Sequence, residues 1–196
     1  YAIWMPSGFS WINARMTSDK NSIAERLVDY TNALDDHMKQ FANAPVQSVA
    51  FGTTGASYLI GREREDQMIA AFQQRYGIPL VMAATAICAA LKHLGATRIG
   101  LVSPYPPDLT DKSIEYWQSR DLDVITVSSA YNDTGAFHPI YALTGSPVSD
   151  ALEPLLDRDD LDAILLLGTG MPTVYPLKAA LGRTSVPMMS CMLALV

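Results

Sequence analysis

Apolar runs bounded by turn residues recur along the chain, and amphipathic segments lie between them. Seven short runs predict strands, at residues 9–14, 46–51, 79–83, 98–103, 123–128, 162–167 and 186–190. Most are continuous rather than alternating, which is typical of strands buried on both faces of an internal sheet. This alternation of strands and helices predicts an α/β fold with parallel β-sheets flanked by helices.

The intervening segments carry apolar residues at spacings of three and four, which is typical of helices packed against a core. They predict helices at residues 18–42, 62–76, 85–94, 108–120, 148–157 and 173–181. Ser22 and Glu25 have the spacing of a capping box at a helix start. Gly77 and Gly95 follow two of the segments, where a left-handed residue that ends a helix is favoured.

Two of the predicted strands end in the same way. The run at 46–51 continues into Gly-Thr-Thr-Gly, and the run at 162–167 continues into Gly-Thr-Gly. In parallel sheets, ligands bind beyond the carboxyl ends of the strands, where free N–H groups and helix N-termini attract anions. Two such ends predict two similar lobes, residues 1–92 (lacking its first strand) and 93–196, with one site between them. For either motif alone, a simple tight turn is an equal alternative.

Charge and composition narrow the class of protein. The chain has 14 basic and 20 acidic residues and a net charge of -6, so it has no basic face for nucleic acid. Two cysteines and three scattered histidines supply neither a disulfide framework nor metal-ligand spacing. No apolar run is long enough to cross a bilayer, and no leader peptide is visible. We therefore expect a cytoplasmic, metal-free protein without a membrane span, which is part of a longer chain.

Small neutral donors at the two strand ends suggest the chemistry of the site. Hydroxyl and backbone N–H groups in a partly dry cleft stabilise a carboxylate or a developing oxyanion. The donors on offer are Thr53, Thr54, Gly55, Thr169 and Gly170. Neither motif has the lysine of a phosphate-binding P-loop or the spacing of a dinucleotide fingerprint, so an NTPase or a dehydrogenase fits poorly.

Three stretches carry a family resemblance: FGTTGASYLIG at 51–61, GIPLVMAATAICAALKHLGATRIGLVSPY at 77–105, and ILLLGTGMPTVYPLKAALGRTSVPMMS at 164–190. They resemble the aspartate/glutamate racemase superfamily, and within it the maleate isomerase and arylmalonate decarboxylase branch. The resemblance implies two pseudo-symmetric α/β lobes around a cofactor-independent site for a small carboxylate or dicarboxylate. It also implies one cysteine at the strand end of each lobe. A homo-oligomer is left open.

The resemblance assigns roles to residues of this chain and also departs at both cysteines. Thr53 stands where the family has its first cysteine, and Gly168, or Thr169 in the next register, stands where it has the second. Neither residue can replace a thiol as a proton donor, because an alcohol is far too weak an acid. The resemblance further implies oxyanion donors at Thr54 and Gly55, a pocket tyrosine at Tyr105, a loosely matched substrate contact at Asn132, and substrate-binding N–H groups at Gly168, Thr169 and Gly170. The family's opening strand, its proline-asparagine motif and its closing helix are not found in these residues.

Other reactive side chains have two interpretations. Cys191 follows the run at 186–190 and is either a displaced catalytic thiol or a small buried hydrophobe. Tyr105 precedes two prolines that could aim its phenol into the cleft, or it packs on the loop. His138 lies in a loop and suits acid–base work or a surface position.

The remaining candidates are expected to be structural. Cys88 lies in an alanine-rich helix, and Tyr58 is a core or subunit-contact aromatic. The charged run at 62–66 is predicted to be a solvated helix face, although its arginines could attract a carboxylate. His37 and His93 are predicted to face solvent.

The first hypothesis is an isomerase- or racemase-family enzyme that acts on a small carboxylate through an enediolate-like oxyanion, without either family cysteine. Decarboxylation by an arylmalonate decarboxylase-like lyase is the alternative, since water or Tyr105 could protonate the enediolate. A carboxylate-binding protein without turnover is a third hypothesis.

Overall fold

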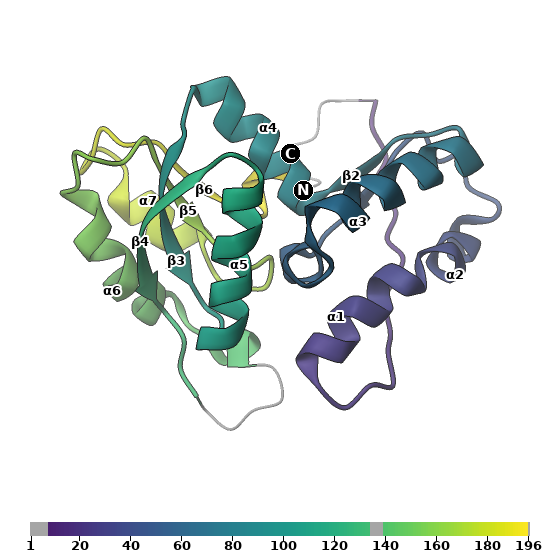
Figure 1. Cartoon of the computed structure of the whole chain (residues 1–196), viewed down its shortest axis with the longest axis horizontal. Helices are drawn as coiled ribbons and strands as arrows, with labels where there is room; N and C mark the ends of the chain where they lie inside the picture. Colours follow the sequence, from purple (N-terminus) through teal and green to yellow (C-terminus); the bar gives the residue numbers. More distant parts are fainter. Residues whose placement is uncertain (1–7, 134–138, 196) are drawn as a thin grey trace.

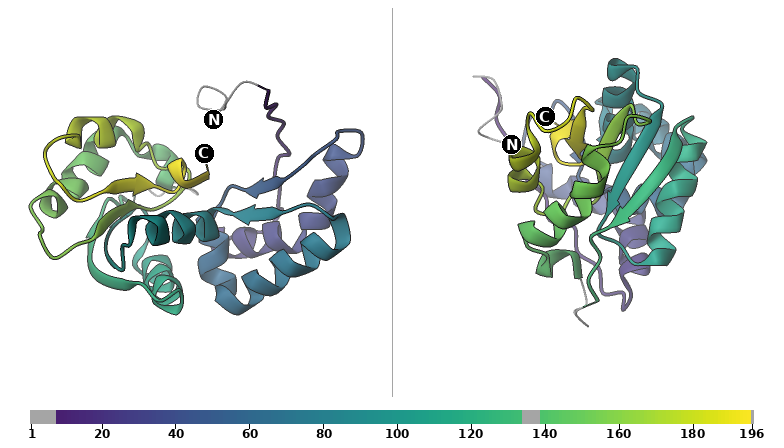
Figure 2. Two further views of the ribbon diagram at one scale, coloured as in Figure 1. Left: turned by 90° about the horizontal axis from the view of Figure 1, so that it is seen from above. Right: turned by 90° about the vertical axis from the view of Figure 1, so that its left-hand side faces the viewer.

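The computed structural model of the protein describes residues 8–133 and 139–195. It contains two parallel sheets flanked by helices, which confirms the predicted α/β class. In the first sheet, β1 (Val49–Phe51) pairs with β2 (Leu80–Met82). The second sheet has the order β4-β3-β5-β6, and its strands are β3 (Arg98–Ser103), β4 (Asp123–Ser129), β5 (Ala163–Leu166) and β6 (Met188–Ser190). The two sheets lie in separate halves of the molecule (Figure 1, Figure 2).

Alternate residues of the central strands enter two different cores, because successive side chains of a strand point to opposite faces. Leu165 and Leu167 pack with Ile87 of α4 (Ala83–Leu94) and Trp117 of α5 (Pro107–Ser119). Ile164 and Leu166 pack on the other face, with residues of α6 (Gly145–Leu156) and α7 (Val174–Ala180). The first core continues into the other half of the molecule, so the two halves share one apolar interior.

The predicted helix at 18–42 is divided into shorter elements. It begins later, at α1 (Ile23–Asn32), after the predicted capping box of Ser22 and Glu25, which the structure confirms. It then continues as α2 (Leu34–Met38) and a 3-10 turn, η1 (Lys39–Phe41). The predicted solvent exposure of His37 is wrong, because its side chain is buried and its Nε2 has no hydrogen-bond partner among residues 8–133 and 139–195. His93 is exposed, as predicted.

Helix α3 (Thr54–Tyr76) begins eight residues earlier than predicted, directly after β1. At Gly61 the backbone has φ 75° and ψ 166°, a conformation that glycine alone adopts readily. This break divides α3 into a short first segment, 54–60, and a longer second segment, 62–76. Gly77 and Gly95 adopt left-handed conformations at the ends of α3 and α4, which confirms both predicted helix ends.

One strand prediction is wrong. Residues 9–14 form no strand, and Phe9 and Ile12 are largely exposed, so the apolar run there has no sheet to pair with. Strand β4 confirms the run predicted at 123–128, and its residues alternate between half-buried and exposed. It lies at the edge of its sheet, so it has a neighbouring strand on one side only.

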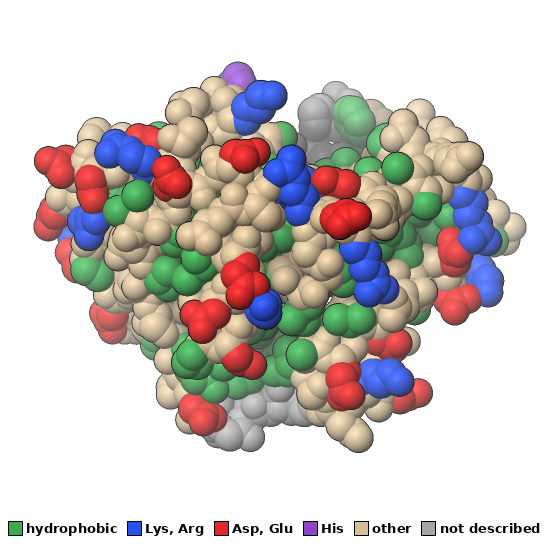
Figure 3. Space-filling model, in the orientation of Figure 1, with side chains coloured by type: hydrophobic (Ala, Val, Ile, Leu, Met, Phe, Trp, Pro, Cys, Tyr) green, Lys and Arg blue, Asp and Glu red, His purple; other side chains and the backbone are tan. Residues whose placement is uncertain are grey.

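Two further observations concern the surface. None of the helices in the described part of the chain is long and apolar enough to cross a membrane. On the face shown in Figure 3, Lys and Arg side chains are interspersed with Asp and Glu rather than gathered in one area.

Candidate active site

Four strand ends place the predicted site residues at one edge of the two sheets. The registers of β3, β5 and β6 align Val102 with Leu166 and Leu166 with Ser190. Because the strands are parallel, the residues that follow them lie on the same side. Tyr105 follows β3, Gly168 follows β5, and Cys191 follows β6. The first turn of α3, which follows β1, meets them from the other half of the molecule.

Three polar side chains meet at this edge. The Thr54 hydroxyl lies 3.4 Å from the Tyr105 hydroxyl and donates to the Cys191 thiol at 3.7 Å. Thr54 and Cys191 are fully buried, and Tyr105 is half-buried. We call Thr54, Tyr105 and Cys191 the polar cluster. It joins two residues that are 137 positions apart in the chain.

The Cys191 thiol is held in its protonated form. Burial raises the pKa of this thiol from 9.0 to about 12, and hydrogen bonds from the Thr54 side chain and the Gly168 backbone oppose the rise only in part. At neutral pH the group is therefore an S–H donor rather than a thiolate nucleophile. Burial of Cys191 fits both interpretations, the displaced catalytic thiol and the small buried hydrophobe. Only its position beside Thr54 and Tyr105 favours the catalytic thiol.

Two tyrosines surround the thiol. Burial raises the pKa of Tyr105, the nearby Cys191 raises it further, and the Thr54 hydrogen bond lowers it. Burial also raises the pKa of Tyr58 well above its ordinary value, and the proximity of Cys191 and Tyr105 adds to this rise. The Tyr58 ring meets the Tyr105 ring edge to face at 6.1 Å. Its hydroxyl has no hydrogen-bond partner within the described residues, although it is buried.

The Gly-Thr-Gly turn after β5 closes tightly on the polar cluster. Gly168 has φ 81°, and a Cβ on it would lie 3.2 Å from the Tyr105 hydroxyl, 3.0 Å from Pro104 Cγ and 2.7 Å from Ile140 Cδ1. Ile140 belongs to η2 (Pro139–Ala142), which covers this turn. The two Gly-Thr strand ends therefore both lie against Tyr105, one through Thr54 and the other through Gly168.

The other predicted site residues lie around the polar cluster or away from it. Gly55 packs against Leu27 of α1 in the first turn of α3. Thr53 is half-buried and caps α3 without a side-chain hydrogen bond. Thr169 and Gly170 are half-buried in the turn after β5. Asn132 is exposed after β4, and His138 lies outside the described residues. Cys88 is partly buried in α4, where burial raises its pKa to about 11.

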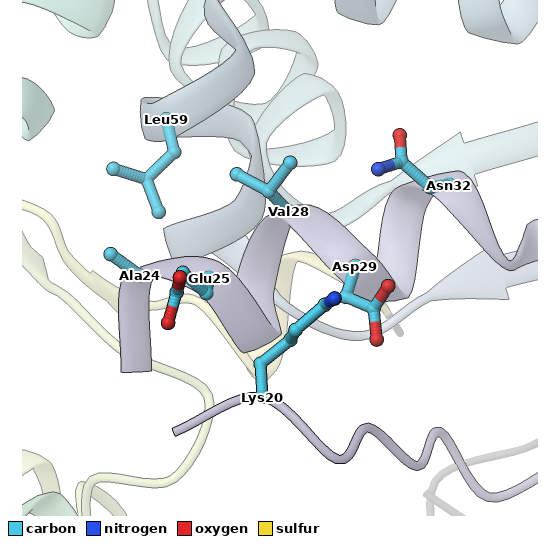
Figure 4. Close-up of a pocket in the computed structure, with 7 residues that line it drawn as sticks. All are labelled: Lys20, Ala24, Glu25, Val28, Asp29, Asn32 and Leu59. Atoms are coloured by element: carbon cyan, nitrogen blue, oxygen red, sulfur yellow. The ribbon is translucent and has the colours of Figure 1, made fainter. Parts of the chain in front are cut away.

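Within the described residues, two open pockets lie away from the polar cluster, one of them beside α6 at residues 156–159, 161 and 183–187. The other, a cavity of about 410 Å³, lies between α1 and α3, where Leu59 faces Ala24 and Val28, and the Lys20 side chain extends along α1 (Figure 4). None of its lining residues belongs to the polar cluster. Among residues 8–133 and 139–195, no three His, Cys, Asp or Glu side chains gather in a way that could hold a metal ion.

Comparison with known protein families identifies the family. The family model for arylmalonate decarboxylase matches residues 20–196. The chain belongs to the arylmalonate decarboxylase family. A search of curated protein sequences gives no significant match. The family match confirms the resemblance seen in the sequence, and it extends through the strand ends that carry the polar cluster.

Solved structures of the same branch share the fold. A liganded double mutant of arylmalonate decarboxylase is 20% identical, with a TM-score of 0.76 over 87% of this chain and 72% of that one. The maleate isomerase Iso from Pseudomonas putida S16, with maleate, is 19% identical, with a TM-score of 0.83 over 98% and 78%. A Nocardia farcinica maleate cis-trans isomerase with a covalent succinylcysteine intermediate is 19% identical, with a TM-score of 0.83 over 96% and 79%. The chain is thus a fold relative of decarboxylases and isomerases.

Sequence reasoning missed the buried charges near the polar cluster. Glu65 is fully buried, so the prediction of a solvated face for the run at 62–66 is wrong at this residue, whereas the other four are exposed. Its carboxylate accepts hydrogen bonds from Ser57, Tyr116 and Arg120. The alternating charges gave no signal for this burial, because its partners lie 51 and 55 positions away.

Replacing Gly168 by alanine is expected to destabilise the protein more than replacing Gly182. Both glycines have positive φ, so alanine costs about 1–2 kcal/mol at either position. A Cβ at Gly182 meets nothing within 4 Å, whereas a Cβ at Gly168 meets three side chains, and this overpacking adds about 1–3 kcal/mol. Urea denaturation of the two variants measures the difference. Equal losses would show that the turn is not packed as described.

Proposed function

We propose that this protein is an enzyme that forms an enediolate from a small dicarboxylate and protonates it, and that its reaction is the decarboxylation of a malonate bearing an apolar substituent. The proposal rests on one observation, the meeting of Thr54, Tyr105 and Cys191 in the polar cluster. Family membership supports the same class of reaction.

The neutral donors of the polar cluster suit an oxyanion. When one carboxylate of a malonate leaves as CO₂, the bond to the α-carbon breaks and its electron pair moves into the remaining carboxylate. The resulting enediolate carries more negative charge on oxygen than the substrate carboxylate. Donors that are fixed beforehand in a buried site stabilise such developing charge strongly. The hydroxyls of Thr54 and Tyr105 and the N–H groups of the Gly168 turn are the donors we assign.

The unpartnered Tyr58 hydroxyl supports an anion at this place. A buried hydroxyl without an acceptor is destabilising, so such groups are uncommon in folded proteins. Tyr58 is buried beside Tyr105 and Cys191, and its hydroxyl lies close to Thr54 and Cys191 without forming a well-aligned hydrogen bond among the described residues. A carboxylate bound against the polar cluster supplies that acceptor.

The thiol completes the reaction as an acid. Cys191 donates its S–H proton to the α-carbon of the enediolate, and the thiolate then regains a proton from water. A thiol whose pKa is raised to about 12 stays protonated at neutral pH, so it is present as a proton donor and not as a nucleophile, and the raised pKa also makes it a weaker acid. The covalent intermediate of the Nocardia isomerase requires attack by a cysteine. The protonated state of Cys191 therefore favours decarboxylation over thiolate-dependent isomerisation in this chain.

Direct incubation tests the proposed function. The folded protein is incubated with phenylmalonate, with maleate, and with chiral amino and hydroxy acids, and the products are followed by NMR. We expect turnover of phenylmalonate and little change in maleate. Turnover of maleate alone would assign isomerisation instead. Thermal stabilisation by these carboxylates without any product would assign a binding protein.

The pH dependence of the rate tests the role of Cys191. A general acid is active in its protonated form, so its activity is lost as the pH rises through its pKa. Because that pKa is raised from 9.0 to about 12, kcat is expected to stay level from neutral pH to about pH 10. A stopped assay of CO₂ release across this range measures the profile. A loss of half the rate near pH 9, in protein that is still folded, would contradict the assignment.

A further inference from the structure

The buried carboxylate of Glu65 connects three parts of the molecule. Its Oε1 accepts a hydrogen bond from Ser57 at 2.6 Å. Its Oε2 accepts from the Tyr116 hydroxyl and, at 2.5 Å, from the Arg120 guanidinium. Glu65 has no exposed surface, and the Arg120 side chain is 12% exposed. An ion pair in this setting holds its partners in one geometry, because the buried carboxylate cannot be solvated by water instead.

The Ser57 hydrogen bond spans the break in α3. Ser57 belongs to the first segment, 54–60, and Glu65 belongs to the second segment, 62–76. The non-helical backbone at Gly61 kinks α3, so side-chain contacts help to set the orientation of the first segment. Ser57 lies one helical turn after Thr54. The bond to Glu65 therefore fixes the turn that presents Thr54 to the site.

The other half of the carboxylate's contacts fixes α5. Tyr116 and Arg120 lie at the end of α5, and the Arg120 Nε also donates to the Tyr116 hydroxyl at 3.1 Å. At the opposite end of α5, Thr110 donates to the Tyr105 carbonyl at 3.2 Å. The Tyr58 ring lies between these ends, 5.5 Å from Tyr116 and 6.1 Å from Tyr105. The position of Tyr105 is thus coupled to the position of Glu65.

We propose that Glu65 is a positioning residue of the candidate active site: through Ser57 and Tyr116 it fixes the first segment of α3 against α5, and so sets the approach of Thr54 to Tyr105. The catalytic consequence rests on the proposed function, whereas the mechanical consequence does not. Glu65 does not touch the polar cluster, and it acts through the residues that carry it.

The test compares Glu65→Gln with Glu153→Gln. Glu153 forms an exposed ion pair with Arg183 on α6, so the second variant makes the same chemical change far from the site. Amide hydrogen exchange is measured for residues 53–60, together with kcat and KM for the substrate that the wild-type protein turns over. We expect exchange in this segment to rise about 10-fold in Glu65→Gln alone, because local opening becomes easier. We expect kcat to fall about 10- to 100-fold with KM within about threefold, because small misplacements of reacting groups are costly.

The two measurements separate the two proposals. Suppose that folded Glu65→Gln exchanges its amides at residues 53–60 as fast as the wild-type protein does, and that its kcat stays within about threefold of wild type. This result overturns the positioning role of Glu65 and leaves the proposed function standing. If the wild-type protein turns over no carboxylate, the proposed function fails and the exchange measurement alone decides. If Glu65→Gln does not fold, Ser57→Ala replaces it, because this variant keeps the Glu65–Arg120 pair, and the same criteria apply.

Discussion

Replacing Cys191 by serine is expected to lower kcat about 10²- to 10⁴-fold, the range for loss of a general acid. Serine is close to cysteine in size and keeps a hydrogen-bonding group beside Thr54, so the fold is expected to persist. Its hydroxyl is a far weaker acid than a thiol and cannot protonate the enediolate at a useful rate. Steady-state kinetics with the malonate that the wild-type protein decarboxylates measure the loss of kcat.

Cys88→Ser is the matched control for this variant. Cys88 is partly buried in α4 and outside the polar cluster, so its replacement is expected to leave kcat unchanged within about twofold. A Cys191→Ser protein with wild-type kcat would contradict the role of the thiol. Water or Tyr105 would then be the proton source, as the sequence alone also allows.

Replacing Arg120 by methionine is expected to lower the free energy of unfolding by about 3 kcal/mol. Removal of one partner of a buried ion pair leaves the other charge unpaired, which costs about 3–5 kcal/mol. We expect the lower end of that range because part of the Arg120 side chain meets solvent and the Ser57 hydrogen bond to Glu65 remains. Urea denaturation at neutral pH measures the change.

Arg183→Met makes the same change in an exposed ion pair. Arg183 pairs with Glu153, and both side chains are about half exposed. Exposed ion pairs contribute about 0–1 kcal/mol, so the free energy of unfolding of this variant is expected to lie within about 1 kcal/mol of the wild-type value. Equal losses in the Arg120 and Arg183 variants would show that the Glu65–Arg120 pair does not stabilise the protein as a buried pair does.

Local patterns predict most of the fold. Strand β3 lies at its predicted residues, and β5 and β6 lie within theirs, because buried parallel strands have continuous apolar sequences. The capping box at Ser22 begins α1 as predicted, and Gly77 and Gly95 end α3 and α4 as predicted. These signals are readable in the sequence because they act over a few residues.

The errors have a common physical cause. The run at 9–14 resembles a strand in composition, but a strand requires a neighbour, and sequence does not show whether one is present. The first segment of α3 was hidden because Gly-Thr-Thr-Gly is typical of a turn, whereas here the helix begins at Thr54 and breaks only at Gly61.

Some features of the candidate site could be predicted from local sequence, and others depend on the tertiary fold. Thr54, Tyr105 and Gly168 were predictable, because strand ends and turn residues mark them locally and the family resemblance supports them. That Cys191 meets Thr54 across 137 positions, and that Glu65 is buried against α5, follows only from the tertiary fold. Whether any of the predicted site residues contacts a substrate stays a prediction, for Thr54, Tyr105, Gly168 and Cys191 as for Thr53, Gly55, Asn132, Thr169 and Gly170.

Decarboxylation of an α-methyl arylmalonate in D₂O tests the central assignment most directly. The α-carbon of this substrate carries no hydrogen, so any deuterium found there in the product entered when the enediolate was protonated. We predict release of one CO₂ and incorporation of one deuterium for each molecule converted by the folded wild-type protein. Absence of both CO₂ release and deuterium incorporation would contradict the assignment of Thr54, Tyr105 and Cys191 as an enediolate-forming site.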